Sequence, residues 1–117
     1  MKQRRVRFTE TAEEHVWREE RWWLENRVHT EIFAEEFEQA LRILAALPAA
    51  GTPYPPANVP GLRRIYLGKI ACHVYYTFDD REVVVRAFWG ARRDRSPFIE
   101  PDGPNSLRPQ GDNRFHG

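Results

Sequence analysis

Two side chains that could transfer protons stand close together in the second half of the chain. His73 and Tyr75 lie two residues apart in the segment His73-Val74-Tyr75-Tyr76. A histidine, with an ordinary pKa of about 6.5, can act as a general base. RNA cleavage by the 2′-hydroxyl also needs an acid and cations that stabilise the phosphate, and Tyr75, Arg64 and Arg92 are of the right types. The simpler interpretation is a histidine exposed on a strand, so His73 and Tyr75 are catalytic candidates only for a ribonuclease.

Arginines form two dense groups that could bind an anion. The groups are Arg63-Arg64 and Arg92-Arg93-Asp94-Arg95. A guanidinium can hold a phosphate or a carboxylate through two parallel hydrogen bonds. The candidate target- or phosphate-binding residues are Arg63, Arg64, Arg86, Arg92 and Arg93. The alternative is that Arg63 or Arg64 pairs with glutamates of the helices.

No pattern indicates a metal site or an organic cofactor. The other histidines, His15, His29 and His116, are scattered, and no spacing of His, Asp and Glu is typical of a metal centre. Cys72 is the only cysteine, which excludes an intrachain disulfide. Its apolar neighbours favour a buried, inert thiol over a nucleophile. We therefore expect no metal and no cofactor.

Charge is divided unevenly along the chain, although the net charge is only +1. Residues 10–47 contain four arginines and ten glutamates, a net charge of −6, whereas residues 61–95 contain eight basic and four acidic residues, a net charge of +4. Two halves of opposite charge should have different partners. The basic half could contact nucleic acid or an acidic segment of another protein.

The elements that would position these side chains begin with a strand and two helices. Residues 4–8 alternate polar and apolar, as in a half-buried strand. Thr9 or Thr11 can cap a helix over about residues 11–25. A second helix, which Thr30 can cap, has the clearest apolar period in the chain. Its apolar residues recur at steps of three and four: Phe33, Phe37, Ala40, Leu41, Leu44 and Leu47.

The first helix is crowded with tryptophan. Trp17, Trp22 and Trp23 are too close in sequence to face one core, so at least one should be exposed or meet a partner. A short link makes the two helices antiparallel neighbours. We expect this hairpin to cover the core and to offer a surface to another protein or to a second copy.

A proline-rich loop over residues 48–60 precedes three strand candidates, at 62–67, 70–78 and 82–89. The order β-α-α-β-β-β predicts an α+β fold, with a helical hairpin packed on a mainly antiparallel four-stranded sheet. Strand alternation would place one set of side chains on an open face away from the helices. That set is Arg5, Arg7, Arg64, Tyr66, His73, Tyr75, Arg86 and Phe88.

The composition changes near the C-terminus. Residues 96–117 contain four prolines, three glycines and few apolar residues. We expect a folded domain over residues 1–95 and an extension over residues 96–117 that is dispensable for folding. No apolar run is long enough to cross a membrane, and the basic N-terminus lacks the apolar stretch of a signal peptide. A cytoplasmic protein without membrane contact is therefore expected.

Several short motifs follow one another in a characteristic order. They are Val6-Arg7-Phe8-Thr9, Ala12, Leu44-Ala45-Ala46-Leu47-Pro48-Ala49-Ala50-Gly51, Gly61-Leu62-Arg63-Arg64, His73-Val74-Tyr75-Tyr76, Asp79-Asp80, Val83–Val85 and Gly90-Ala91-Arg92-Arg93. In order and spacing they resemble the RelE/ParE superfamily, the toxins of bacterial type II toxin–antitoxin systems. The resemblance covers roughly residues 4–95.

The resemblance implies a growth-inhibiting toxin whose partner is a cognate antitoxin. ParE-like members poison DNA gyrase, whereas RelE-like members cut mRNA on the ribosome and use a tyrosine or histidine near the C-terminus. Ser96-Pro97-Phe98-Ile99 contains no tyrosine, and Cys72 stands where such nucleases have a basic residue. We expect ParE-like gyrase poisoning, with a ribosome-dependent mRNA endoribonuclease as the alternative, so enzymatic activity stays open. Either a homodimer or a toxin–antitoxin hetero-oligomer would fit.

Overall fold

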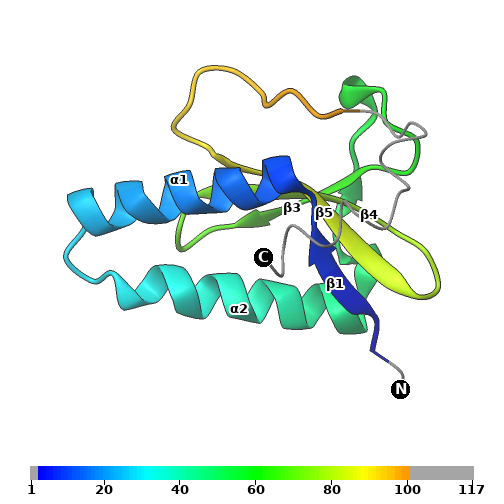
Figure 1. The fold of residues 1–117 in the computed structure, drawn as a ribbon, viewed down its shortest axis with the longest axis horizontal. Helices are drawn as coiled ribbons and strands as arrows, with labels where there is room; N and C mark the ends of the chain where they lie inside the picture. The colour runs from blue at the N-terminus through cyan, green and yellow to red at the C-terminus, as the bar shows by residue number, and fades with distance from the viewer. Residues whose placement is uncertain (1–2, 101–117) are drawn as a thin grey trace.

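The chain folds as a pair of helices packed on a mixed sheet, and the computed structural model describes residues 3–100 (Figure 1). In chain order the elements are β1 (Arg5–Phe8), α1 (Glu10–Asn26), α2 (Glu31–Ala46), the 3-10 turn η1 (Pro48–Ala50), β2 (Thr52–Pro53), the 3-10 turn η2 (Pro55–Ala57), β3 (Arg63–Leu67), β4 (Cys72–Phe78) and β5 (Glu82–Gly90). The strand order in the sheet is β1-β5-β4-β3-β2. The predicted α+β class is confirmed.

The sheet is mainly antiparallel, as expected, but it has one strand more than expected. β1 runs parallel to β5, with Val6 opposite Val83 and Phe8 opposite Val85, while the other pairs are antiparallel. The sheet has five strands instead of four because the two-residue β2 pairs with the start of β3 at the far edge. The first strand of the chain therefore packs beside the last.

The two helices begin differently. The Thr9 hydroxyl accepts a hydrogen bond from the Ala12 amide at 3.1 Å, so Thr9 is the cap of α1. Thr30 precedes α2, but its side chain makes no capping hydrogen bond and its backbone angles are helical. The prediction that the Thr30 side chain caps α2 is therefore wrong. Within the described residues, neither helix combines the length and the apolarity that a membrane span needs.

An aromatic core fills the space between the helices and the sheet. Leu44 of α2 is 0% exposed, and Phe33, near the start of the same helix, is buried in the same core. The Phe88 ring of β5 meets Phe33 at 5.9 Å and Phe37 at 5.5 Å between ring centroids, both in T-shaped contacts, an orientation that suits the charge distribution of aromatic rings. These contacts hold α2 against β5.

A β-bulge in β5 changes which side chains face the helices. Tyr75 pairs with Ala87, but Tyr76 pairs with Val85, so Arg86 is an extra residue on β5. After Arg86 the alternation is reversed, and Phe88 faces the inner core instead of the outer face. The prediction that Phe88 shares the open face is therefore wrong.

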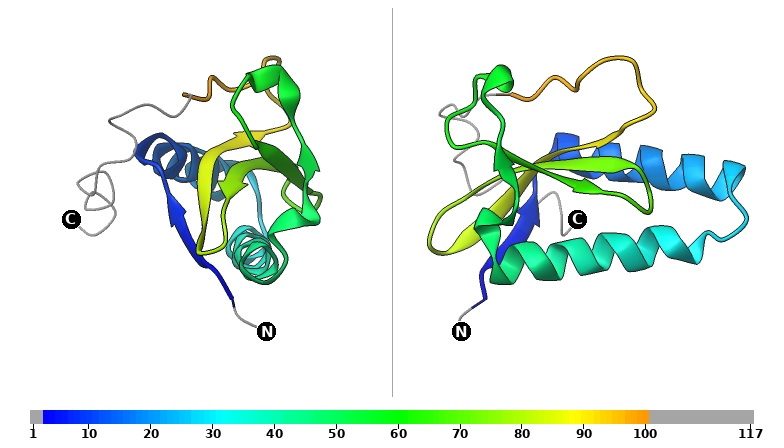
Figure 2. Two further views of the ribbon diagram at one scale, coloured as in Figure 1. Left: turned by 90° about the vertical axis from the view of Figure 1, so that its right-hand side faces the viewer. Right: turned by 180° about the vertical axis from the view of Figure 1, so that it is seen from behind.

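The outer face of the sheet carries a second, smaller core. The residues that pack there are Val59, Leu62, Tyr75, Ala87, Trp89 and Ile99. They belong partly to the loop around η2 and to the segment after β5, which both lie across the sheet from α2 (Figure 2). The outer face is thus largely covered, and Tyr75 is only 2% exposed. Ile99 is 5% exposed, so this residue of the expected 96–117 extension packs against the outer core.

Leu44→Ala should lower the free energy of unfolding by about 2–5 kcal/mol, because it leaves a cavity in the inner core. Leu47→Ala is the matched control, since Leu47 follows the same helix but is 59% exposed, contrary to its predicted core position. Its effect should stay below about 0.5 kcal/mol. Urea denaturation measures both values. Equal, small losses would show that Leu44 does not anchor α2.

Candidate functional site

A cluster of aromatic rings around one arginine forms the accessible part of the outer face. Tyr66 of β3 lies opposite His73 of β4, with 4.8 Å between ring centroids. His73 is 6.2 Å from Tyr75 by the same measure. The Arg64 guanidinium stacks over Tyr54 at 4.7 Å and lies 5.9 Å from the centre of Tyr75. These five residues, the outer-face cluster, combine a cation, a histidine and exposed aromatic surface.

The two catalytic candidates are adjacent, and their surroundings shift the pKa of each. Burial lowers the pKa of His73, and the nearby Arg64 guanidinium lowers it further. His73 is therefore neutral near pH 7, and its Nδ1 is buried without a hydrogen-bond partner among the described residues. Burial raises the pKa of Tyr75, so its hydroxyl holds its proton firmly. A neutral imidazole can still accept a proton, so of the two candidates it is Tyr75, which is 2% exposed, that is poorly placed for proton transfer.

Arg63 and Arg86 have structural contacts. Arg63 donates to the carbonyl of Gly51 at 2.8 and 3.1 Å and to the carbonyl of Ala49 at 3.3 Å, which fastens the loop after α2 to β3. Arg86, at the bulge, donates to the Thr77 hydroxyl at 2.9 Å. Of the arginines predicted on β3, only Arg64 belongs to the outer-face cluster.

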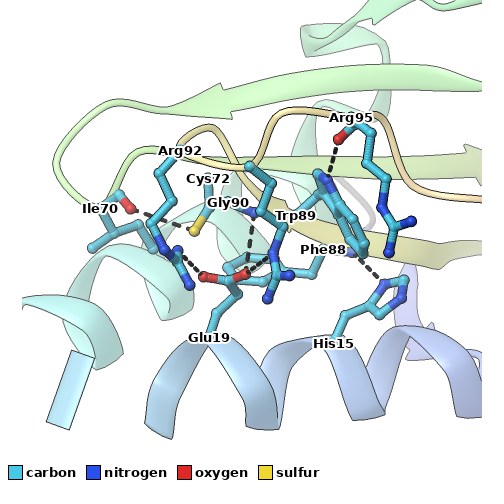
Figure 3. Close-up of polar contacts among 10 residues, drawn as sticks. His15, Glu19, Ile70, Cys72, Phe88, Trp89, Gly90, Arg92 and Arg95 are labelled. Atoms are coloured by element: carbon cyan, nitrogen blue, oxygen red, sulfur yellow. Dashed lines mark hydrogen bonds and ion pairs between the residues drawn. The ribbon is translucent and has the colours of Figure 1, made fainter. Parts of the chain in front are cut away.

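Arg92 and Arg93 hold a buried carboxylate. Glu19 of α1 is 1% exposed and accepts from Arg92 at 2.6 Å and from Arg93 at 3.0 Å (Figure 3). The Gly90 amide donates a further bond to Glu19 at 3.3 Å. Paired hydrogen bonds of this kind offset the cost of burying a charge. Both side chains, which were predicted to bind an anion, thus bind the carboxylate of Glu19 in the same chain.

Two tryptophans and a glycine surround this ion pair and stabilise it. Arg92 stacks on Trp22 at 4.0 Å and Arg93 on Trp89 at 4.7 Å, contacts that favour cations. A Cβ at position 90 would lie 2.5 Å from an Arg92 nitrogen and 2.9 Å from a Glu19 oxygen. Glycine at position 90 therefore permits the close approach of carboxylate and guanidinium.

His15 and Cys72 border the same site in uncharged forms. His15 Nδ1 accepts from the Phe88 amide at 3.3 Å (Figure 3). Burial, with the charges of Arg18 and Arg93, lowers the pKa of His15 to about 4. Burial and the Glu19 charge raise the pKa of the Cys72 thiol to about 12, which makes it a poor nucleophile. In the described part of the chain, no three His, Cys, Asp or Glu side chains gather as metal ligands would.

Two residues of these sites were not identified from the sequence. Glu19 could have been, because it lies seven residues after Ala12 and four before Trp23, which places it on the buried side of α1. Tyr54 could not have been, since it belongs to a proline-rich loop without a period. Its hydroxyl lies 3.4 Å from the Ser96 hydroxyl and helps to join that loop to the segment after β5.

Comparison with known proteins identifies the family. Residues 6–95 match the family model described as ParE toxin of type II toxin-antitoxin system, parDE. The chain belongs to the ParE toxin family. No curated protein matches the toxin in sequence. A solved structure described as "Chromosomal ParDE TA system from P. aeruginosa" shares its fold, with a TM-score of 0.60, 15% identity and coverage of 77% of this chain and 98% of that one.

Membership of this family makes the protein the toxin component of a type II toxin–antitoxin module. The resemblance found in the motifs of the sequence is thereby confirmed, on the ParE side of the superfamily. The fold agrees, because the similar structure also comes from a ParDE system.

Replacing Arg92 and Arg93 together with alanine should lower the free energy of unfolding by about 3–5 kcal/mol, because Glu19 would remain buried without a cation. Glu19→Gln should cost less, since both arginines can reach solvent. Arg95→Ala is the control, because the side chain of Arg95 is exposed. Urea denaturation compares the three. A double variant as stable as the unaltered toxin would mean that the carboxylate has other support. A loss of toxicity in this double variant would report unfolding as much as a lost contact.

Stability should fall with acid because of His15. Its folded pKa of about 4 lies below the ordinary value of 6.5, so between these values the unfolded chain binds more protons than the folded one. Stability is thus highest above pH 6.5 and decreases as the pH falls toward 4. Between about pH 7 and pH 5 the loss should be about 2 kcal/mol larger than in His15→Gln. Chemical denaturation at each pH measures it, and the subtraction removes contributions from other groups. Parallel profiles would contradict the assignment.

Proposed function

We propose that this toxin inhibits growth by binding DNA gyrase and trapping its cleaved DNA complex, without an active site of its own. The observation that carries the proposal is the burial of Tyr75, which is 2% exposed beneath Tyr54. A general acid must reach the leaving group of its substrate, and this hydroxyl cannot. The acid–base pair expected of a ribonuclease is therefore incomplete on this face, and the match to the ParE family supports the same choice.

The surface proposed to meet gyrase is the exposed part of the outer-face cluster. Tyr66 is 52% exposed, and Arg64 and His73 lie beside it, each partly exposed. Aromatic rings and arginine are the side chains that most often dominate the energy of a protein interface. Arg63, Arg86, Arg92 and Arg93 would support this surface through the contacts described above, and Arg64 would be the arginine that touches the target.

A cognate antitoxin is the second proposed partner. The net charge of +4 over residues 61–95 would attract an acidic segment of such a protein. Residues 1–95 would be the toxin domain, with residues 96–117 as an extension. The toxin would act in the cytoplasm, where gyrase works.

Purified toxin should inhibit the supercoiling of plasmid DNA by gyrase, increase the amount of cleaved plasmid, and leave in vitro translation unaffected. Tyr66→Ala should weaken the inhibition about tenfold or more, as the loss of a central interface residue does. Arg81→Ala is the matched control, because Arg81 is exposed at the β4–β5 turn, at the other end of the strands. It should inhibit as well as the unaltered toxin.

His73→Ala separates the two mechanisms. For a binding poison the variant should retain most of its inhibition of gyrase, since a single flanking ring is removed. The ribonuclease alternative predicts the opposite. If the toxin blocks translation and cuts mRNA, and folded His73→Ala does neither, the protein is an enzyme and the proposal is wrong.

A further inference from the structure

The strands from β2 to β4 and the loops between them carry charge of one sign. Residues 51–78 contain Arg63, Arg64 and Lys69 but neither Asp nor Glu. Arg63 is engaged with backbone carbonyls, and Lys69 lines a hollow on the α2 side of the sheet. Arg64 is therefore the cation of this region that lies on the outer face, where neither β3 nor β4 offers a carboxylate to neutralise it.

Arg64 is held in place by stacking contacts. Its guanidinium lies over the Tyr54 ring at 4.7 Å and near Tyr75, and no described carboxylate forms an ion pair with it. Stacking uses the flat face of a guanidinium, whereas its N–H donors point outward in the plane, where they can hold a phosphate. Because the side chain is already ordered, binding an anion would cost little conformational entropy.

A platform of rings lies beside Arg64. Tyr66 is 52% exposed, and its ring centre is 4.8 Å from that of His73 on the neighbouring strand. The lowered pKa of His73 keeps its ring neutral near pH 7, so a flat partner can cover it without desolvating a charge. Tyr66 and Arg64 are two residues apart on one face of β3, roughly 7 Å along the strand. This spacing is comparable to that between a nucleotide base and its own phosphate.

Aliphatic surface of the kind that proteins bury at an interface lies elsewhere. Within residues 51–78, all of which the structure describes, the Val, Leu and Ile side chains are buried or half-buried. The predicted exposure of one tryptophan of the first helix is confirmed for Trp17, at 60%, and Leu24 and Leu47 are exposed on or beside the helices as well. The core of a protein interface is mostly apolar and poor in charge. Rings beside a cation instead suit a partner that offers flat bases and negative charge.

We propose that Tyr66, His73 and Arg64 bind single-stranded DNA, with a base stacked on the two rings and its phosphate held by the Arg64 guanidinium. This inference rests on the proposed function, because a gyrase complex with cleaved DNA would supply such a strand. Duplex DNA fits less well, since its bases are already stacked on one another. An acidic protein segment would neutralise Arg64 but would leave the rings without a flat partner.

Binding is measured with the purified full chain alone. Fluorescence anisotropy of a labelled single strand of about 12 nucleotides should give a Kd on the order of 10 µM near 0.1 M salt, within the range of non-specific binding. Tyr66→Ala should weaken binding about tenfold or more, whereas Tyr66→Phe should bind as the unaltered toxin does, because stacking does not need the hydroxyl. Arg81→Ala, at the exposed β4–β5 turn, is the control and should change Kd less than about twofold. Circular dichroism should show that all variants are folded.

The salt dependence separates the cation from the rings. Arg64→Gln should reduce the slope of log K against log salt concentration by about 0.7, the value for one phosphate contact on a single strand. Tyr66→Ala should leave the slope unchanged, because stacking releases no counterions. An unchanged slope in Arg64→Gln would show that Arg64 holds no phosphate and would overturn the proposal.

A strand without bases tests the platform from the side of the ligand. An abasic oligonucleotide of equal charge should bind the unaltered toxin about tenfold less tightly than the normal strand, and should bind Tyr66→Ala and the unaltered toxin equally. Equal affinity of the toxin for the two strands would overturn the proposal. Tighter binding of a glutamate-rich peptide of the same charge, or of an RNA of the same sequence, would also overturn it and assign this surface to that partner.

Gyrase inhibition is a separate readout of the proposed function. If Tyr66→Ala and the unaltered toxin bind the strand equally while only the unaltered toxin inhibits gyrase, the surface meets protein, and the DNA inference alone is overturned. If the toxin binds the strand through Tyr66 and Arg64 but leaves supercoiling untouched, the inference is supported and the proposed function is contradicted.

Discussion

The fold of this toxin depends on the neutralisation of one buried carboxylate, that of Glu19. Glu19 is 1% exposed, and a carboxylate so placed is tolerated only with charged hydrogen-bond partners. Arg92, Arg93 and the Gly90 amide supply them from the residues at and directly after the end of β5. The bond network joins α1 to the sheet at this point. It also fixes the direction in which the chain leaves the last strand.

The path of that segment decides what the outer face of the sheet can do. Trp89 Nε1 donates to the carbonyl of Arg95 at 2.7 Å, and Ile99 then packs into the outer core. This core covers Tyr75, a catalytic candidate only under the ribonuclease alternative, whereas Arg64 and Tyr66 stay accessible and can contact other molecules. Because Arg92 and Arg93 pair with Glu19, the densest basic cluster of the sequence stabilises the fold.

Much of the fold was predictable from the sequence, because its determinants are local. Apolar residues at steps of three and four specify α2, and their phase places Leu44 in the core. Thr9 begins α1 through a bond to a residue three positions away. Alternating segments identified β3, β4 and β5 to within about two residues, a usual uncertainty for element ends. The order of short motifs was sufficient to indicate the toxin family, and the arginines and His73 were recognised as chemically capable groups.

Only the tertiary structure decided how those groups are used. The bulge at Arg86 reverses the alternation of β5, so that Phe88 enters the inner core, and no periodicity within β5 announces an inserted residue. The partners of Glu19 lie 71 to 74 residues away in the chain. Ile99 is buried by a surface that exists only after β4 and β5 have paired. Charge neutralisation and packing act between side chains that are near in space, and nearness across such separations is a property of the folded chain, which local sequence patterns do not encode.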